Sequence, residues 1–326
     1  MTRSHAAIIT AHGGPDVIGW IDAELPPPGA GEVRMRNRAI GLNFIDTYHR
    51  KGIYPISLPS GLGIEAAGVV EAVGPGVSGF SVGDRVATFG PQLGAYCDVR
   101  NVAAASLFAL PDAISDDIAA AALLKACTAE FLVERCAKVQ AGWPVLVHAA
   151  AGGVGLILVQ WLKSVGATVI GTVSNDAKAA MARAAGADHV INYTAEPCAP
   201  RVRELTDGAG VRVTFDGVGL DTWESSLDAT GKRGLIVSYG NASAPVTGIS
   251  LGVLATKGSL FNTRPTLFDY YADPAERKAG AARVFDMIAS GTIAITIGQR
   301  YALADAAQAH IDLEARATTG STLLVP

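Results

Sequence analysis

The stretch Ala149-Ala150-Ala151-Gly152-Gly153-Val154-Gly155 decides the fold of this chain. It follows an apolar run at residues 145–149 and opens a second one at residues 153–165. A short apolar run, a glycine turn and a longer apolar run predict a buried strand, a tight turn and a buried helix. Residues 143–162 also have the hydropathy of a membrane span, but Trp143-Pro144 and three glycines within them favour the strand, turn and helix.

The glycine turn has the spacing of a phosphate-binding loop. Aligned on the pattern G-x-G-x-x-G, its three key positions hold Ala150, Gly152 and Gly155. Gly152 would let the backbone approach a pyrophosphate, and Gly155 would let the helix pack closely on the strand. Because the first position is Ala, the pattern alone also fits a turn that binds no ligand. The strand before it, together with the helix and strand after it, favours a dinucleotide site at the helix start.

Strands and helices alternate after the glycine turn. We predict strands at residues 145–149, 168–173, 189–193, 211–216, 233–239 and 259–263, and helices at residues 153–165, 177–185 and 201–206. An alanine-rich helix at residues 115–136 precedes them. Such alternation is typical of the α/β class with a doubly wound parallel sheet, the Rossmann fold.

The rest of the chain predicts a second domain. Between residues 32 and 100, short β segments are separated by glycine turns, as in an antiparallel, barrel-like β domain. After Arg264, a predicted helix at residues 274–290 leads to a β-rich tail that we expect to return to this domain. The predicted organisation is a β domain of residues 1–126 and 265–326, interrupted by a dinucleotide-binding domain of residues 127–264.

The end of the second predicted strand indicates which dinucleotide binds. An NAD site usually has Asp or Glu there, whereas an NADP site has neutral and basic groups. Here Ser174 lies nineteen residues after Gly155, and no acid occurs between residues 168 and 175. Lys178, one helical turn further on, offers a cation for a 2′-phosphate. The prediction is NADPH, although Asp176 lies close by, and Ser174 or Asn175 also fits a plain helix N-cap.

Composition excludes several other classes of protein. The 326 residues are 49% hydrophobic, the formal net charge is −4, and no block of five like charges occurs. Nucleic acid or an anionic lipid surface is therefore not an expected partner. The four cysteines form no C-x-x-C pair, and no His lies at metal-ligand spacing from them. We expect reduced, partly buried thiols and a cytoplasmic protein.

Several stretches together resemble the medium-chain dehydrogenase/reductases, and most of all the zinc-independent quinone oxidoreductases. The pieces that carry the resemblance are residues 43–48 (NFIDTY), 59–68 (PSGLGIEAAG), 82–86 (VGDRV), 148–155 (HAAAGGVG), 191–193 (INY), 238–241 (SYGN) and 263–265 (TRP). The resemblance implies a GroES-like catalytic domain beside the Rossmann domain. Zinc enzymes of this fold have Cys in the first piece and Gly-His-Glu in the second, whereas this chain has Asn43 and Gly63-Ile64-Glu65. No catalytic metal is therefore expected.

The resemblance also implies the residues of the site. The expected catalytic residues are Asn43, Asp46 and Tyr48. The expected cofactor-binding residues, including the glycine turn, are Phe44, Tyr48, Thr128, Phe131, Gly152, Gly153, Val154, Gly155, Thr172, Ser174, Asn175, Lys178, Tyr193, Gly217, Tyr239, Gly240, Asn241, Thr263, Arg264 and Arg316. At residues 216–219 the family often has Asp-Ser-Val-Gly, but this chain has Asp-Gly-Val-Gly. A hydroxyl contact to the cofactor is then expected to be replaced by backbone contacts.

Most of these residues also have a purely structural interpretation. Asn43 and Asp46 fit the cap of a turn or helix, and Tyr48 fits simple packing. Arg264 fits a surface ion pair. Glu65 is expected to be a structural hydrogen-bonding group, and His148, on a predicted buried strand, a satisfied core residue.

The predicted function is NADPH-dependent reduction of quinones. Without a Lewis acid, hydride transfer to an electron-poor acceptor is easier than removal of hydride from a simple alcohol. We expect the acceptor to enter between the two domains, with Asn43 or Tyr48 donating to the developing oxyanion. One alternative is NADPH-dependent reduction of the C=C bond of an enone or enoyl substrate. Another is a non-enzymatic structural role, as in lens crystallins, or an RNA-binding role. The resemblance also implies a homodimer formed through an edge strand at residues 259–263.

Overall fold

A computed structural model describes residues 2–326, and these residues form two compact units. Unit 1 comprises the residues up to Leu124 together with Ile295–Pro326, and unit 2 is Lys125–Ala294. Unit 1 is thus interrupted by unit 2 in the chain. The units place residues 265–294 with the dinucleotide-binding part, whereas the sequence-based division placed them with the β domain. That division into domains stays a prediction.

Unit 2 is built on a six-stranded sheet, with strand order β10-β9-β8-β11-β12-β13 and every pairing parallel. Its strands are β8 (Pro144–Val147), β9 (Thr168–Val173), β10 (His189–Asn192), β11 (Val211–Asp216), β12 (Thr230–Ser238) and β13 (Phe261–Thr263). The chain runs outward from β8 through β9 to β10, then returns to β11 on the other side of β8. The strand order therefore reverses between β8 and β11, where doubly wound sheets bind their ligands.

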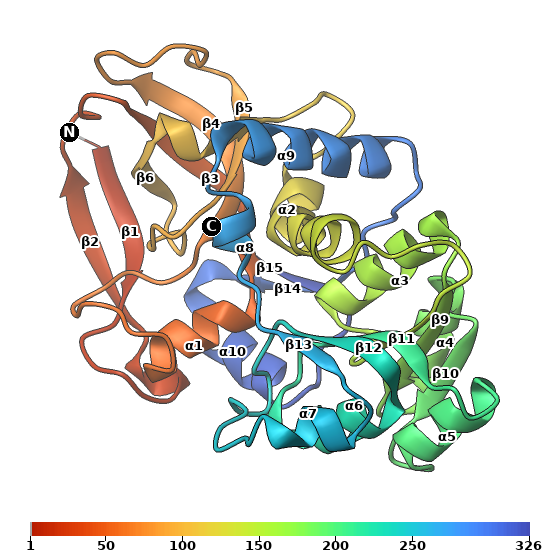
Figure 1. Cartoon of the computed structure of the whole chain (residues 1–326). Helices are drawn as coiled ribbons and strands as arrows, with labels where there is room; N and C mark the ends of the chain where they lie inside the picture. Colours follow the sequence, from red (N-terminus) through yellow and green to blue (C-terminus); the bar gives the residue numbers. More distant parts are fainter. Residues whose placement is uncertain (1) are drawn as a thin grey trace. The chain divides into compact units, whose positions relative to one another are not determined.

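Helices cover both faces of this sheet. The helices of unit 2 are α3 (Gly153–Val165), α4 (Asp176–Ala184), α5 (Cys198–Leu205), α6 (Trp223–Ala229), α7 (Gly252–Thr256), α8 (Leu267–Tyr270) and α9 (Pro274–Ala289), with the second half of α2 (Asp116–Glu130). Figure 1 shows α3 on one side of the strands and α6 and α7 on the other. The predicted Rossmann class is confirmed, because apolar strands buried on both faces need helices on each side.

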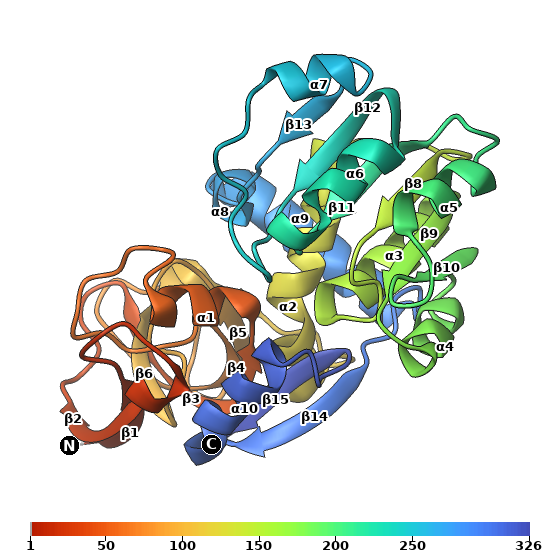
Figure 2. The ribbon, with the colours of Figure 1, turned by 90° about the horizontal axis from the view of Figure 1, so that it is seen from below.

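Unit 1 holds a mostly antiparallel sheet in the order β14-β15-β3-β4-β5-β7, with β6 also paired to β3, and a separate hairpin, β1-β2. Its elements are β1 (Thr2–Ile8), β2 (Gly19–Leu25), β3 (Glu32–Leu42), α1 (Phe44–Lys51), β4 (Glu65–Val73), β5 (Arg85–Phe89), β6 (Val99–Ala103), β7 (Leu107–Ala109), β14 (Ile297–Ala302), α10 (Ala306–Glu314) and β15 (Ser321–Val325). Figure 2 shows the tail strands β14 and β15 beside β3 and β4. The predicted return of the tail to the β domain is confirmed.

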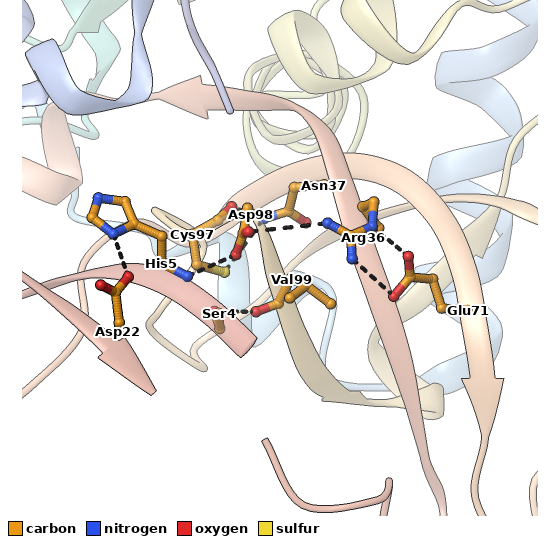
Figure 3. Close-up of polar contacts among 9 residues, drawn as sticks. All are labelled: Ser4, His5, Asp22, Arg36, Asn37, Glu71, Cys97, Asp98 and Val99. Atoms are coloured by element: carbon orange, nitrogen blue, oxygen red, sulfur yellow. Dashed lines mark hydrogen bonds and ion pairs between the residues drawn. The ribbon is translucent and has the colours of Figure 1, made fainter. Parts of the chain in front are cut away.

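Polar contacts attach the N-terminal hairpin to the larger sheet (Figure 3). The Ser4 hydroxyl donates to the Val99 carbonyl at 2.5 Å, and the His5 amide donates to Asp98 Oδ1 at 2.9 Å. On the neighbouring strand β3, Asn37 Nδ2 donates to the Cys97 carbonyl at 2.9 Å. The segment Cys97-Asp98, just before β6, is therefore hydrogen-bonded both to β1 and to β3.

Two predicted elements differ from the structure. The helix expected at residues 115–136 is α-helical only to Glu130 and continues as a π-helical segment, Phe131–Cys136. The wider turn shifts the side-chain register, which alanine-rich composition does not reveal. The tail, expected to be β-rich, also contains the helix α10.

Within residues 2–326, no helix is both long and apolar enough to span a membrane. None of the four cysteines forms a disulfide, and Cys97 and Cys127 are buried, as expected from the sequence.

Candidate active site

The glycine turn lies at the switch point of the unit 2 sheet, between the end of β8 and the start of α3. A Cβ on Gly155 would lie 2.2 Å from the Ala149 carbonyl oxygen, so only glycine allows the helix to approach the strand this closely. A Cβ on Gly152 would meet only that same oxygen, at 3.3 Å, and otherwise open space. The turn is thus closely packed at Gly155 and open at Gly152, which precedes the first residue of α3. This geometry fits a pyrophosphate.

A buried network of hydrogen-bonded side chains lies beside the glycine turn, at the end of β8. Ser226 Oγ donates to Asp216 Oδ2 at 2.7 Å, and His148 Nε2 lies 3.1 Å from Ser226 Oγ. His148 Nδ1 lies 3.1 Å from Thr172 Oγ1. Burial lowers the pKa of His148, although Asp216 opposes the shift, so the ring is neutral and donates through Nε2. His148 is 2% exposed, and its predicted role as a satisfied core residue is confirmed.

Thr172 is a buried member of this hydrogen-bond chain, and its hydroxyl contacts His148 within unit 2. Thr172 therefore supports the turn, and a direct contact to the cofactor stays a prediction.

The loop after β11 is organised by Asp216. Asp216 Oδ1 accepts the backbone N–H groups of Val218 (2.9 Å) and Gly219 (3.0 Å). Thr222 Oγ1 donates to the same carboxylate at 2.8 Å. The backbone contacts expected here in place of a hydroxyl are therefore not available from Val218 and Gly219, because both amides already have an acceptor.

The end of β9 carries the residues expected at the adenosine end. Asn175 caps α4, its side-chain oxygen accepting the Lys178 amide at 2.9 Å, which matches the alternative interpretation of Asn175 as an N-cap. Asp176 Oδ1 accepts from Asn192 Nδ2 at 3.3 Å, so this acid is directed to β10. Ser174 follows directly after β9, and Tyr193, 43% exposed, follows β10.

The other expected residues of unit 2 lie on three elements. Thr128 is on α2, and Phe131, at the start of the π-helical segment, stacks on Tyr270 with ring centroids 4.5 Å apart. Arg264 follows β13, which contains Thr263, and its guanidinium donates to the Asn241 side-chain oxygen at 3.2 Å. Arg264 is thus held beside the loop after β12, which also contains Gly240 and Tyr239.

In unit 1, the expected catalytic residues lie at the start of α1. Asn43 Nδ2 donates to Glu65 Oε2 at 2.8 Å and to the Gly41 carbonyl at 3.3 Å. Both N–H groups of Asn43 are thus committed to protein acceptors. Glu65 Oε1 accepts the Leu124 amide at 2.6 Å, so its predicted structural role is confirmed. Asp46 is 0% exposed and accepts the Asn43 amide at 2.9 Å, and its expected catalytic role stays a prediction.

Tyr48 lies one turn further along α1, among aromatic rings. Its ring makes an edge contact with Tyr54, with centroids 5.2 Å apart, and a tilted contact with Phe44 at 6.3 Å. The ring is therefore held on two sides. Arg316, the remaining expected cofactor contact, is exposed after α10 with a φ of 60°.

A buried hydrogen-bond chain that the sequence did not reveal connects α10 to Asp46. Arg50 donates to His310 Nδ1 at 2.8 Å, so the proton of the neutral imidazole is on Nε2, 3.0 Å from the Tyr96 hydroxyl. Tyr96 in turn donates to Asp46 Oδ2 at 2.9 Å. Burial and then the Arg50 charge lower the pKa of His310 to about 3. The donors therefore all point the same way, from Arg50 to Asp46.

The sheet with a glycine turn at its switch point and the interrupted β unit define a dehydrogenase/reductase of the medium-chain class. Residues 29–112 match the family described as alcohol dehydrogenase GroES-like domain, and residues 153–271 match zinc-binding dehydrogenase. The chain is 53% identical over 317 residues to a quinone oxidoreductase of Pseudomonas aeruginosa, and the aligned region spans 97% of this chain and 98% of that protein. It belongs to the quinone oxidoreductase family of this class.

Two further relatives are informative. The crystal structure of Escherichia coli quinone oxidoreductase complexed with NADPH is 48% identical, with a TM-score of 0.97 and coverage of 99% of this chain and 100% of that one. A 2-haloacrylate reductase from Burkholderia sp. is 45% identical over 328 residues, which cover 98% of each chain.

The residues at the positions of a catalytic zinc do not fit a metal. Asn43 faces Glu65 with its donor nitrogen, and the Glu65 carboxylate is fully buried against protein N–H groups. Elsewhere in residues 2–326, no group of three or more His, Cys, Asp or Glu is arranged to hold a metal ion.

Proposed function

We propose that this protein is an NADPH-dependent quinone reductase. The proposal is carried by the residues at the end of β9. In a doubly wound sheet this is where an acid would bind a ribose 2′-hydroxyl, and here Ser174 follows the strand and no acid is present. Asp176, the nearest acid, is directed to Asn192. The relative of known structure that is 48% identical was solved with NADPH, which agrees with this choice of dinucleotide.

The residues of unit 2 fit the dinucleotide. The open side of Gly152 and the α3 amides would hold the pyrophosphate, and Lys178 and Tyr193 the adenosine 2′-phosphate. Bound NADPH supplies a hydride from its nicotinamide ring. The chain itself contributes orientation of the acceptor and a hydrogen bond to the oxygen that becomes negative.

Tyr48 is our candidate for that hydrogen bond. Both N–H groups of Asn43 are committed to Glu65 and Gly41, whereas the Tyr48 ring is fixed by Phe44 and Tyr54. The capping of α1 by Asp46 sets the direction of the helix from which Tyr48 projects. We therefore assign Asn43 and Asp46 to positioning and Tyr48 to contact with the acceptor, with solvent as the source of the second proton.

Replacing Lys178 tests the choice of cofactor. In Lys178→Ala we expect the Kd for NADPH to rise about tenfold, as for the loss of one charge-assisted hydrogen bond to phosphate. The Kd for NADH should not change. Fluorescence titration with each nucleotide measures both values.

Arg183→Ala is the matched control, because Arg183 is an exposed cation in the last turn of the same helix. It should bind both nucleotides like the unmodified protein. Equal affinity of the unmodified protein for NADPH and NADH would contradict the assignment.

A second candidate function is reduction of an activated C=C bond. The 45% identity to a 2-haloacrylate reductase favours it, since the name of that protein implies a conjugated alkene as substrate. Both reactions deliver a hydride to an electron-poor π-system, so the same site serves either. Side-by-side turnover of a quinone and of an enone with NADPH separates them, and the larger kcat/KM identifies the substrate class.

We also propose a homodimer formed through β13. This strand is an edge of the unit 2 sheet and is three residues long, and Phe261 on it is 63% exposed. An edge strand has unpaired backbone groups that a second copy can pair across a two-fold axis.

The dimer proposal predicts that Phe261→Glu gives a monomer in size-exclusion chromatography with light scattering, because a charge would be buried at the new pairing. Val82→Glu, at an exposed apolar residue of unit 1, should leave the mass unchanged. A monomeric unmodified protein, or a dimeric Phe261→Glu variant, would refute this interface.

We place the protein in the cytoplasm, a proposal supported by four cysteines that form no disulfide.

A further inference from the structure

A groove lies at the amino ends of strands in the unit 2 sheet, whereas the glycine turn lies at their carboxyl ends. The volume of the groove is about 300 Å³. Its lining residues include Trp143, Arg212, Arg233, Leu235 and Phe261. Trp143 directly precedes β8, Arg212 is the second residue of β11, and Phe261 is the first residue of β13. These strands and β12 are neighbours in the parallel sheet (Figure 2), so the groove is separate from the end that binds dinucleotides in such folds.

The floor of the groove is apolar. In the register of the sheet, Val213 lies opposite Leu235, and Leu235 lies opposite Phe261. Side chains at matched positions of neighbouring strands point to the same face of a sheet, so these three line one surface. Leu235 is half-buried and Phe261 is exposed. A flat apolar group placed on this floor would be removed from water on one side.

Two arginines make the groove cationic. The Arg212 guanidinium lies over the Trp143 ring, 5.2 Å from its centroid, and donates to the Arg233 carbonyl at 3.5 Å. Stacking on an aromatic ring restrains the plane of a guanidinium group. Within residues 2–326, neither Arg212 nor Arg233 takes part in an ion pair, and no residue that lines the groove is acidic. The groove therefore favours an anion.

The backbone of Arg233 is an independent sign of a site. Its φ is 57°, in the left-handed region that glycine adopts readily and that a residue with a Cβ adopts at a cost. The Arg233 amide donates to the Gly258 carbonyl at 2.8 Å, which holds this conformation. Strained backbone is concentrated at ligand-binding positions. Here it places a cation in the wall of the groove, where glycine would be the less strained residue.

We propose that this groove binds a small aromatic carboxylate. The ring packs on Leu235 and Phe261, and the carboxylate accepts hydrogen bonds from Arg212 and Arg233, because a planar guanidinium matches a carboxylate with paired N–H donors. A volume of about 300 Å³ is at the lower end for ligand pockets, which suits a molecule of one or two rings. The groove extends inward from the edge strand β13 as far as β8, and the proposal does not depend on the proposed function.

Titration calorimetry with 2-naphthoate as the probe tests the site, with and without NADPH. The unmodified protein should bind 2-naphthoate with the same Kd in both conditions, because the groove and the dinucleotide turn lie at opposite ends of the strands. The neutral analogue 2-naphthamide should bind about tenfold more weakly, as for the loss of one charge-assisted hydrogen bond. Arg233→Gly should raise the Kd for 2-naphthoate by about the same factor, without lowering the melting temperature, since glycine suits the φ of this position.

The matched control is Lys138→Gly. Lys138 is an exposed cation with a φ of 50°, next to Ala137 of the groove, but it does not line the groove itself. This variant removes the same charge from the same kind of backbone position and should bind 2-naphthoate like the unmodified protein. Absence of binding would overturn the inference, and so would equal losses in Arg233→Gly and Lys138→Gly, or equal Kd values for 2-naphthoate and 2-naphthamide. Competition between 2-naphthoate and NADPH would also overturn it, by placing the probe at the dinucleotide turn.

Discussion

Gly155→Ala is expected to lower the unfolding free energy by about 3 kcal/mol, the upper range for overpacking at a close contact. The new Cβ would lie 2.2 Å from the Ala149 carbonyl oxygen and 2.9 Å from two backbone atoms of Ala150. Backbone atoms cannot move aside as the end of a flexible side chain can, so α3 must shift away from β8. The shift also displaces the first amides of α3, and we expect the Kd for NADPH to rise about 100-fold, as for two lost charge-assisted hydrogen bonds.

Gly152→Ala separates folding from binding in the same turn. Its φ of −79° suits any residue, and its Cβ would meet only the Ala149 carbonyl oxygen at 3.3 Å. We expect nearly unchanged thermal stability but weaker NADPH binding, because the methyl group occupies the side that the pyrophosphate approaches. Thermal melting and NADPH titration of the two variants measure both effects. A Gly152→Ala variant that binds normally would show that the phosphates lie elsewhere.

Arg50→Met is expected to destabilise the protein by about 3–5 kcal/mol, the usual cost of removing one partner of a buried ion pair. Arg50 is 0% exposed, and its guanidinium donates to both Glu314 oxygens at 2.9 Å and to His310 Nδ1 at 2.8 Å. It also donates to the Gly13 carbonyl at 3.1 Å. Methionine fills much of the volume but removes the Arg50 donor from His310 Nδ1 and from the Gly13 carbonyl, and leaves Glu314 paired with Lys51. Chemical denaturation of both proteins measures the difference.

Lys51→Met is the control on the same helix. Lys51 also pairs with Glu314, at 2.5 Å, but its side chain is 44% exposed, so its loss should cost less than about 1 kcal/mol. If the two variants were equally stable, the buried hydrogen-bond chain would not contribute as the structure indicates.

The same cluster determines a pH dependence. Burial and the Arg50 charge lower the pKa of His310 to about 3, whereas an unfolded histidine titrates near pH 6.5. The unfolded state therefore binds a proton that the native state excludes, and stability should fall as the pH decreases from about 6.5 towards 3.

Protonation of Glu314 should lower the stability of the protein further, at a lower pH. Burial alone would raise its pKa, but the hydrogen bonds from Lys51 and Arg50 outweigh burial and lower it. The contribution of the pair is present above the unfolded pKa of about 4.3 and is lost as the pH falls through the lower native pKa. Melting temperatures between pH 4 and 8 should decline on the acid side, and less steeply in Arg50→Met, where His310 no longer has the Arg50 charge beside it.

Local patterns account for what could be predicted about unit 2. The glycine turn, the apolar strand before it and the periodic helix after it are contiguous in the chain, and the helix at Gly153–Val165 has the predicted bounds. The strands Thr168–Val173 and Val211–Asp216 also begin and end where their apolar runs do. The missing acid at the end of β9 is equally local, since it concerns the few residues that follow one strand.

The candidate catalytic residues show the limit of such patterns. The family resemblance pointed to Asn43 and Asp46 as catalytic groups, which stays a prediction, and only the structure shows their hydrogen bonds to Glu65 and Tyr96. Those partners lie 22 and 50 residues away in the chain, at no regular spacing. A polar side chain looks the same in a sequence whether its partner is a ligand or a neighbouring strand.

The sequence by itself determined the α/β class, the glycine turn and the choice of NADPH, because each depends on residues that are neighbours along the chain. Only the tertiary structure decided that Arg50, 260 residues from His310, lies beside it, and that the Tyr239 ring occupies the space over Gly217. These contacts form when distant segments pack, and their distances depend on strand order and register, which are properties of the whole sheet.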